Sequence, residues 1–280
     1  MLKTYHFQGE IAWPHLLFLG AVHGNETAGP QAQKEIINLI QKGEIKIKKG
    51  HVTFIPIVNE AAYEKDVRCI DVNLNRVIKK YESPQNNEEK IANELTNFIE
   101  NCDIMVDLHS THCPEDEEFW FIDYPDEKNR ELLSLIPVKV ALAWWPEIYR
   151  NHPEITNFCT EEYAHQNGKA GMTVECGYHK APHAIQVAKQ TIENVLSYYG
   201  IIDSLPVQTF TPKMITLDSF ITKEKEGKML KAYQHLDPIQ EGEVIARYED
   251  GEEICSPLQG YLIMPNHEAK IGTEWFYFGK

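Results

Sequence analysis

The chain has no hydrophobic run that approaches the ~18 residues needed to cross a bilayer. Its first residues, Met1 to His6, also lack the basic start and apolar core of a secretory signal. The six cysteines are scattered without a C-x-x-C pair, which argues against a disulfide framework and against a zinc site built on thiolates. These absences argue against a membrane-spanning or secreted protein and favour a cytoplasmic protein with reduced thiols.

Positive charge is also scarce. The chain has 27 Lys and Arg residues against 42 Asp and Glu residues, a net charge of −15, and no basic tract. Nucleic acids and anionic membranes are bound by clustered Lys and Arg, so neither is an expected partner. The expected ligand is a small molecule, and the sequence does not indicate an oligomeric state. Only five arginines occur: Arg68, Arg76, Arg130, Arg150 and Arg247.

The length of 280 residues and the 42% hydrophobic content allow one large α/β domain and a smaller one. Apolar runs alternate with helical patterns over most of the chain. The runs predict strands over 16–22, 52–58, 104–108, 119–122 and 172–174, and the helical patterns cover 27–42, 87–101, 154–166 and 182–199. The polar stretch 59–86 is expected to be a long, irregular loop, and such loops are often functional.

The helical signal disappears from about residue 205, where short apolar segments alternate with Gly, Pro and Asp turns. We therefore predict a catalytic α/β domain over residues 1–204 and a small β domain over residues 205–280.

Three reactive side chains are expected where predicted strands end. His23 follows the first strand, His109 follows the 104–108 strand and Glu175 follows the 172–174 strand. Open α/β sheets bind ligands at this edge. Asn25 is a candidate N-cap, which would place Glu26 in the first turn of a helix beside His23. The alternative is that these are polar groups at strand ends, with their hydrogen bonds satisfied and no chemical role.

His23 and Glu26 in a His-x-x-Glu spacing, with His109 from another strand end, form a ligand set for one Zn²⁺. Two imidazoles and one carboxylate leave the fourth tetrahedral position open, which is typical of a catalytic site. Asp107 would face the same way as His109 and could orient its imidazole, or could be a buried structural residue. The first hypothesis is therefore a zinc hydrolase.

Four short motifs, in order, resemble the succinylglutamate desuccinylase/aspartoacylase family, a branch of the zinc carboxypeptidase superfamily. They are His23-Gly24-Asn25-Glu26, Asp71-Val72-Asn73-Leu74-Asn75-Arg76, Asp107-Leu108-His109-Ser110 and Val174-Glu175-Cys176-Gly177. The resemblance covers residues 16 to about 200. It implies a carboxypeptidase-like mixed sheet flanked by helices, followed by a β domain that narrows access to the site.

The resemblance also implies the roles of the site residues. Glu175 matches the catalytic glutamate, which would take a proton from a zinc-bound water and pass it to the leaving amine. Arg68 matches the arginine that polarises the scissile carbonyl, and Asn75 with Arg76 matches the grip on a substrate carboxylate. Alternatively, Glu175 is an ion-paired residue at a strand end and each arginine is a solvated loop residue.

The expected substrate is a small N-acyl amino acid with a free carboxylate. Aspartoacylases have a further arginine shortly before the catalytic glutamate, but here the segment 163–169 offers only His165 and Lys169. N-acetylaspartate is therefore a less favoured substrate than for an aspartoacylase. The alternatives are a carboxypeptidase that acts on peptides, which the C-terminal β domain should hinder by crowding the cleft, or a non-catalytic binding protein on the same scaffold.

Overall fold

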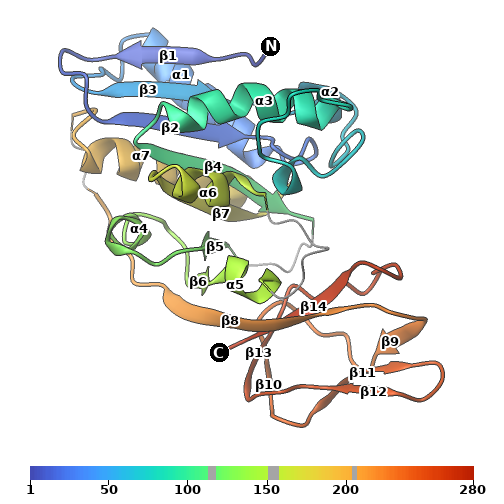
Figure 1. Cartoon of the computed structure of the whole chain (residues 1–280). Helices are drawn as coiled ribbons and strands as arrows, with labels where there is room; N and C mark the ends of the chain where they lie inside the picture. The colour runs from blue at the N-terminus through green and yellow to red at the C-terminus, as the bar shows by residue number, and fades with distance from the viewer. Residues whose placement is uncertain (113–117, 151–157, 204–206) are drawn as a thin grey trace.

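The computed structural model describes residues 1–112, 118–150, 158–203 and 207–280. Its main feature is one mixed sheet with the strand order β1-β3-β2-β4-β7-β5-β6-β8-β14-β13-β10. The strands in its first seven places are β1 (Tyr5–Gln8), β3 (His51–Ile55), β2 (His15–Gly20), β4 (Ile104–Thr111), β7 (Ala170–Tyr178), β5 (Phe119–Ile122) and β6 (Val140–Ala143). The predicted α/β fold with a mixed sheet flanked by helices is thereby confirmed (Figure 1).

The centre of the sheet is parallel, because β3, β2, β4 and β7 all run in the same direction. All eight residues of β4 are buried. Such near-continuous burial is typical of parallel strands that are covered on both faces. Since these strands end at the same edge, the residues after β2 and the last residues of β4 and β7 come together there.

Helices cover both faces of the sheet (Figure 1). On one face, α1 (Ala28–Gln41) packs against α7 (Pro182–Tyr198), with Ile36 and Ile192 fully buried in the shared core. The opposite face carries α3 (Asn87–Glu100) and α6 (Thr160–Gln166). The predicted helices over 27–42, 87–101 and 182–199 are confirmed. The one predicted over 154–166 begins at Thr160 in the described chain, and residues 154–157 lie outside the described residues.

Asn25 is not the N-cap that we expected. The helix begins at Ala28 with Thr27 at the N-cap position, so Glu26 precedes the helix instead of lying in its first turn. The physical reason is a tight turn over residues 23–26, in which the Glu26 backbone N–H donates to the His23 carbonyl oxygen at 3.1 Å. The helix begins only after this turn, at Ala28.

Several short elements differ from the sequence prediction. The segment 59–86, expected to be irregular, contains α2 (Glu60–Glu64) and the 3₁₀ turn η1 (Leu74–Arg76). The strand predicted over 52–58 stops before Pro56, and β1, α4 (Glu127–Leu133) and α5 (Trp145–Tyr149) were not predicted. Among the described residues, none of the helices has the length and apolar character that a bilayer crossing requires.

Every described element after α7 is a strand, as the sequence predicted. Four of them extend the main sheet: β8 (Lys213–Thr222), β14 (Glu274–Gly279), β13 (Gly260–Ile263) and β10 (Asp237–Ile239). A second sheet contains β9 (Gly227–Met229), β11 (Val244–Tyr248) and β12 (Glu253–Cys255). The expected boundary between residues 204 and 205 lies outside the described residues and stays a prediction.

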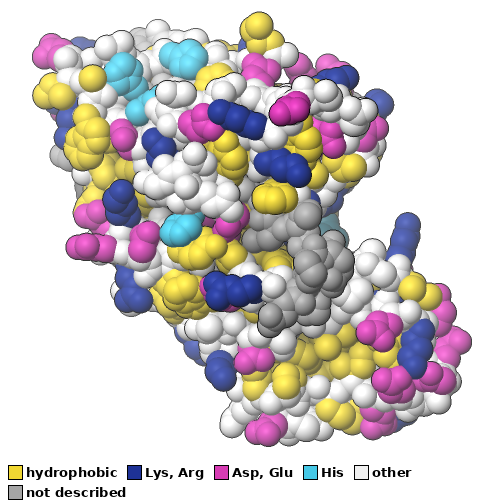
Figure 2. Space-filling model, in the orientation of Figure 1, with side chains coloured by type: hydrophobic (Ala, Val, Ile, Leu, Met, Phe, Trp, Pro, Cys, Tyr) yellow, Lys and Arg dark blue, Asp and Glu magenta, His cyan; other side chains and the backbone are white. Residues whose placement is uncertain are grey.

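Charged side chains of both signs are interspersed on the surface. Figure 2 shows Asp and Glu side chains spread among Lys and Arg over the α/β part and over the C-terminal strands. On this face Asp and Glu side chains occur over both parts of the chain, with Lys and Arg side chains among them.

Candidate metal centre and active site

The loop after β2 carries the first two candidate ligands, and its shape depends on close packing. A Cβ added at Gly24 would lie 2.2 Å from the backbone carbon of Ala62 in α2, so only glycine fits there. The Gly24 N–H also donates to the Arg68 carbonyl oxygen at 3.1 Å. The loop thus brings His23 and Glu26 together, with Nδ1 of His23 at 2.7 Å from Oε1 of Glu26.

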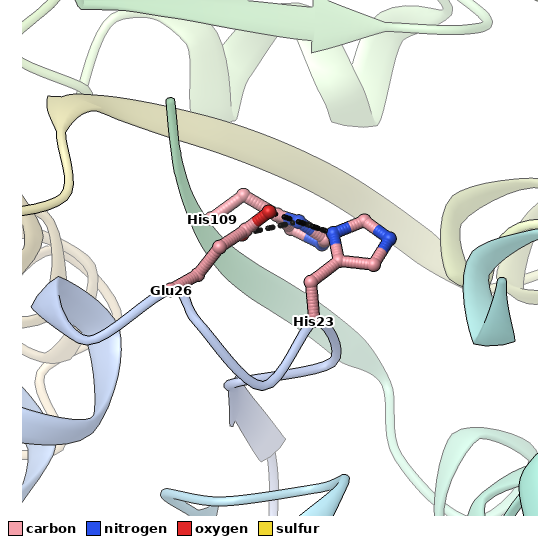
Figure 3. A group of neighbouring side chains, drawn as sticks. All are labelled: His23, Glu26 and His109. Carbon is pink, nitrogen blue, oxygen red and sulfur yellow. Dashed lines mark hydrogen bonds and ion pairs between the residues drawn. The ribbon is translucent and has the colours of Figure 1, made fainter. Parts of the chain in front are cut away.

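His109 reaches the same point from β4. Its Nδ1 lies 2.9 Å from Oε2 of Glu26 and 3.2 Å from Nδ1 of His23 (Figure 3). All three side chains are buried, with at most 3% of each residue exposed. Tetrahedral ligands about 2.0–2.1 Å from Zn²⁺ lie about 3.3 Å from one another, so this spacing suits a single zinc ion. Within the described chain, these three residues form the one group with such an arrangement of possible ligands.

The outward nitrogens of both imidazoles are held by neighbours. Nε2 of His23 lies 2.9 Å from Oδ1 of Asn73, and Nε2 of His109 lies 2.9 Å from Oδ2 of Asp107. The bond to Asn73 fixes the tautomer of His23 and leaves its Nδ1 free to bind a metal, whereas Asp107 lies at ion-pair distance from Nε2 of His109 and does not meet it with hydrogen-bond geometry. Sequence reasoning considered Asp107 for this role and overlooked Asn73, although Asn73 stands two residues before Asn75 in a recognised motif.

The electrostatics of the centre keep the carboxylate ionised. Burial raises the pKa of Glu26, but His23 and His109 outweigh it and hold the pKa well below its usual range. Burial, followed by the charge of Arg68, lowers the pKa of His23 to about 4. Burial acts in the same direction on His109, but Asp107 and Glu26 raise its pKa well above the usual value. Glu26 as an anion and His23 as a neutral ring are the protonation states that a metal requires.

Glu175 stands beside His109 in the sheet, because the two residues are partners in the β4–β7 register. The side chain is half-buried, and its Oε2 is enclosed without a hydrogen-bond partner among the described residues. Burial and then the charge of Glu26 raise the pKa of Glu175 to about 8. A carboxyl group with a free oxygen and a raised pKa can hold and release a proton near neutral pH.

Arg68 lies at the open side of the centre. Its Nη1 is 3.3 Å from Oε1 of Glu26, and the side chain is 52% exposed. It is also among the positive charges that lower the pKa of Glu175. The structure thus brings Arg68 into the same site as His23, Glu26 and Glu175.

Asn75 and Arg76 adjoin the centre through η1 and α6. The Thr160 N–H donates to Oδ1 of Asn75 at 3.0 Å, so only the amide N–H groups of Asn75 are left to bind a carboxylate. Nη1 of Arg76 donates to the Asn75 carbonyl oxygen at 2.8 Å. Burial lowers the pKa of Arg76, but Tyr149, Glu274 and Tyr277 outweigh it and raise the pKa.

The sequence analysis gave no role to Tyr149, Glu274 and Tyr277, the residues that raise the pKa of Arg76. The Tyr149 hydroxyl donates to Oε1 of Glu274 at 2.8 Å, and the Tyr277 hydroxyl lies 3.0 Å from that of Tyr149. Two of these residues come from β14, so the C-terminal strands contribute to the surroundings of Arg76. Tyr277 stands in an aromatic run, Trp275 to Phe278, whose pattern reads as core and carries no signal for this contact.

The chain is an α/β protein whose mixed sheet carries a buried His-Glu-His group beyond its parallel strands, with a carboxyl group alongside, and this combination defines a candidate metal-binding site. Residues 12–199 match the family described as "Succinylglutamate desuccinylase/Aspartoacylase catalytic domain", and the chain belongs to that family. The resemblance recognised from the four motifs is therefore confirmed.

Solved structures of other proteins resemble this chain over nearly its whole length. The match in sequence to a curated protein covers a shorter part of the chain. The product-bound ectoine utilization protein EutE (DoeB) from Ruegeria pomeroyi has a TM-score of 0.78 at 20% identity, covering 100% of this chain and 89% of that chain. The succinylglutamate desuccinylase from Vibrio cholerae has a TM-score of 0.79 at 16% identity, covering 99% and 85%. At these identities the likeness shows the fold.

A curated relative adds a match in sequence. A protein described as "Probable aspartoacylase" from Prochlorococcus marinus (strain MIT 9312) is 34% identical over 106 residues. The match spans about a third of this chain and about a third of the length of that relative, 34% of each.

Proposed function

We propose that this chain is a zinc-dependent amidohydrolase that cleaves the amide bond of a small N-acyl amino acid. The observation that carries the proposal is the buried group of His23, Glu26 and His109, whose inward atoms have ligand spacing. The two activities in the family's description, desuccinylase and aspartoacylase, are both hydrolyses of an acyl amide and support this reaction class.

The proposed cofactor is one Zn²⁺ per chain, held by His23, Glu26 and His109. When bound, it would polarise the amide carbonyl and acidify a water molecule. Two imidazoles and one carboxylate fit zinc and leave a coordination position for substrate or water.

Proton transfer, charge stabilisation and substrate binding are assigned to four further residues. Glu175 takes a proton from water and delivers it to the leaving amine, so that amide hydrolysis yields a carboxylic acid and the free amino acid. Arg68 is placed to stabilise negative charge that develops on the carbonyl oxygen. Arg76, with the N–H groups of Asn75, holds the free carboxylate of the amino acid.

The cell location is part of the proposal. No disulfide joins the five described cysteines (Cys69, Cys102, Cys159, Cys176 and Cys255). Free thiols are typical of a reducing compartment, which supports a cytoplasmic enzyme. We retain the division into a catalytic part over 1–204 and a β part over 205–280 as a proposal.

The test combines metal analysis with a substrate panel. We expect about one zinc per chain and hydrolysis of N-acetyl or N-succinyl amino acids, with their C-terminal amides slower by at least ~10-fold because the charge-assisted bonds to Arg76 are lost. Arg76→Ala should remove this difference. Equal wild-type rates on acids and amides would refute the carboxylate clamp, and efficient release of residues from long peptides would favour a carboxypeptidase. A zinc-loaded protein that hydrolyses none of them would refute the proposed function.

A further inference from the structure

Glu88 is a buried acidic residue outside the metal centre, and the proposed mechanism does not use it. It lies in the first turn of α3 and is 0% exposed. Its Oε1 accepts a hydrogen bond from the Ile70 N–H at 2.8 Å, and its Oε2 accepts from the N–H groups of Asp71 and Val72 at 3.1 and 3.4 Å. A charge is tolerated in the protein interior only where donors satisfy it. Glu88 therefore binds three consecutive backbone amides of the loop that joins α2 to η1.

The same carboxylate also holds the residue that starts α2. Oε1 of Glu88 accepts from Nδ2 of Asn59 at 2.9 Å, and Oδ1 of Asn59 caps α2 by accepting from the Ala62 N–H at 3.3 Å. Asp71 forms a bond in the opposite direction, because its Oδ2 accepts from the Asn87 N–H of α3 at 2.9 Å. Burial raises the pKa of Glu88, but its hydrogen bonds outweigh burial and lower the pKa below the usual value. Glu88 is therefore an ionised anchor for the loop.

Arg68 lies just before the segment that Glu88 holds. It stands two residues ahead of Ile70, and its carbonyl oxygen accepts from the Gly24 N–H at 3.1 Å. Its Nη1 lies 3.3 Å from Oε1 of Glu26, and the side chain is 52% exposed. A half-exposed side chain is not fixed by packing alone, so the position of the guanidinium depends on its backbone. That backbone is held between the turn of the metal ligands and the amides bound by Glu88.

Asn73 lies just after the held segment, because it follows Val72 directly. Its Oδ1 is 2.9 Å from Nε2 of His23 and also accepts from the Asn75 N–H at 3.0 Å. It is the N-cap residue of η1, which carries Asn75 and Arg76. A displacement of the Val72 amide would therefore be passed to an imidazole of the metal centre.

We propose that Glu88 is a positioning residue, which acts on hydrolysis through Arg68 and on metal binding through Asn73. This inference rests on the proposed function and adds to it a residue that touches neither the substrate nor the metal. A guanidinium that stabilises developing charge must be in place before the transition state forms, and a misplacement of about 1 Å can cost ~10²-fold in rate. Glu88 supplies this placement because it fixes the backbone between Arg68 and Asn73.

The experiment is a double-mutant cycle of Glu88→Gln with Arg68→Ala on the zinc-loaded protein, with the N-acyl amino acid that the wild type hydrolyses fastest. Gln keeps the size of the side chain but replaces one carboxylate oxygen by an NH₂ group, which cannot accept from the loop amides. We expect Glu88→Gln to lower kcat/KM by at least ~10-fold when Arg68 is present. In the Arg68→Ala background the loss should be no more than about threefold, because the residue through which Glu88 acts is absent.

The cycle distinguishes positioning from a loss of stability. Partial unfolding would lower kcat/KM by the same factor in both backgrounds, so equal losses with and without Arg68 would overturn the action through Arg68. Glu89→Gln is the matched control, because it removes the same charge from the next residue of the first turn of α3, where Oε2 of Glu89 accepts from the Gln85 N–H. We expect it to keep kcat/KM within about twofold of wild type, as for most surface substitutions. A loss as large as that of Glu88→Gln would also overturn the inference.

Zinc affinity separates failure of this inference from failure of the proposed function. The probe is zinc alone, in competition with a chelator of known affinity. Glu88→Gln should weaken zinc binding by ~10-fold, because Asn73 no longer holds the ring of His23 in place, and Glu89→Gln should leave it unchanged. An unchanged affinity in Glu88→Gln refutes the action through Asn73 whatever the kinetics show.

The two failures then have different signatures. If N-acyl amino acids are hydrolysed but the losses in the cycle are equal and zinc affinity is unchanged, the positioning role of Glu88 is refuted and the amidohydrolase stands. If no N-acyl amino acid is hydrolysed, the amidohydrolase fails, and zinc affinity alone decides whether Glu88 positions the metal centre.

Discussion

Two buried clusters of this chain contain carboxyl groups, and they differ in how the negative charge is balanced. In the His23, Glu26 and His109 centre, each outward ring nitrogen faces an oxygen and the inward atoms face one another. In the Asp123 and Glu161 pair, neutral groups supply the donors: the Asp123 N–H donates to Glu161 at 2.8 Å and the Cys159 thiol donates to Asp123 at 3.5 Å. The ligand spacing of the first cluster suits a bound dication, whereas in the second cluster burial and neighbouring carboxylates favour a bound proton, because they raise the pKa of both Asp123 and Glu161.

The largest effect is expected from His109→Ala, which removes a ligand from the first cluster. Zinc binding should be lost and hydrolysis should fall by ~10³-fold or more, because the metal contributes several kcal/mol of charge stabilisation. Metal analysis and kinetics measure this, with circular dichroism as the check that the fold is retained. Full zinc occupancy in the variant would remove His109 from the ligand set.

Glu175→Gln should separate chemistry from metal binding. The amide keeps the shape of the side chain but cannot accept the proton, so kcat should fall by ~10²–10⁴-fold with zinc content unchanged. A near-normal kcat would assign the proton transfer to another group. Loss of zinc would show that Glu175 supports the first cluster instead.

Asp107→Asn should have an intermediate effect. It weakens the acceptor beside Nε2 of His109, now 2.9 Å away, and zinc affinity should fall by ~10–100-fold. Competition with a chelator of known affinity measures the change. Because Thr160 also donates to Asp107 at 2.7 Å, Thr160→Val is the control for lost packing of α6 and should leave zinc affinity nearly unchanged.

Asp123→Asn tests the second cluster through stability, where the expected effect is smallest. The pKa of Asp123 is raised from 3.8 to about 7, so the native state binds more protons than the unfolded state between these pH values. Stability therefore falls as pH rises through this range. The wild type should lose ~1 kcal/mol or more relative to Asp123→Asn between pH 4 and pH 8. Thermal unfolding at both pH values measures it, and an unchanged difference in Tm would contradict the uncompensated charge of Asp123, which faces Glu161, Glu162, Cys159 and Arg76.

The sequence was sufficient where local pattern decides structure. The apolar runs predicted the parallel strands, and the position after each run predicted that His23, His109 and Glu175 would meet at one edge. Periodicity predicted the long helices within a few residues. The N-cap was wrong because Thr27 and Asn25 are both acceptable capping residues, and the choice between them depends on a turn that the pattern does not show.

The polar segment 59–86 was beyond prediction for a different reason. Its backbone conformation depends on a residue beyond the segment, Glu88 of α3. The N–H groups of Ile70 and Asp71 donate to the buried Glu88 carboxylate at 2.8 and 3.1 Å. In the sequence Glu88 reads as an ordinary acidic residue in the first turn of a helix. The groups that raise the pKa of Arg76, Tyr149, Glu274 and Tyr277, lie up to about 200 residues away along the chain, and no spacing rule predicts their influence.

The strand β8 pairs with β6 on one side and with β14 on the other, so the main sheet passes without interruption from the α/β part into the C-terminal strands. A shortened version of the chain that stops ahead of β8 would leave the backbone of β6 as an open sheet edge. It would also expose apolar side chains, such as Leu142 of β6, that share a core with Ile215 of β8. Open edges recruit strands from other molecules. Anyone who seeks a minimal catalytic fragment should therefore expect precipitation from the cut at residue 204. A shorter C-terminal truncation meets the same problem, because the last strand, β14, lies inside the sheet between β8 and β13.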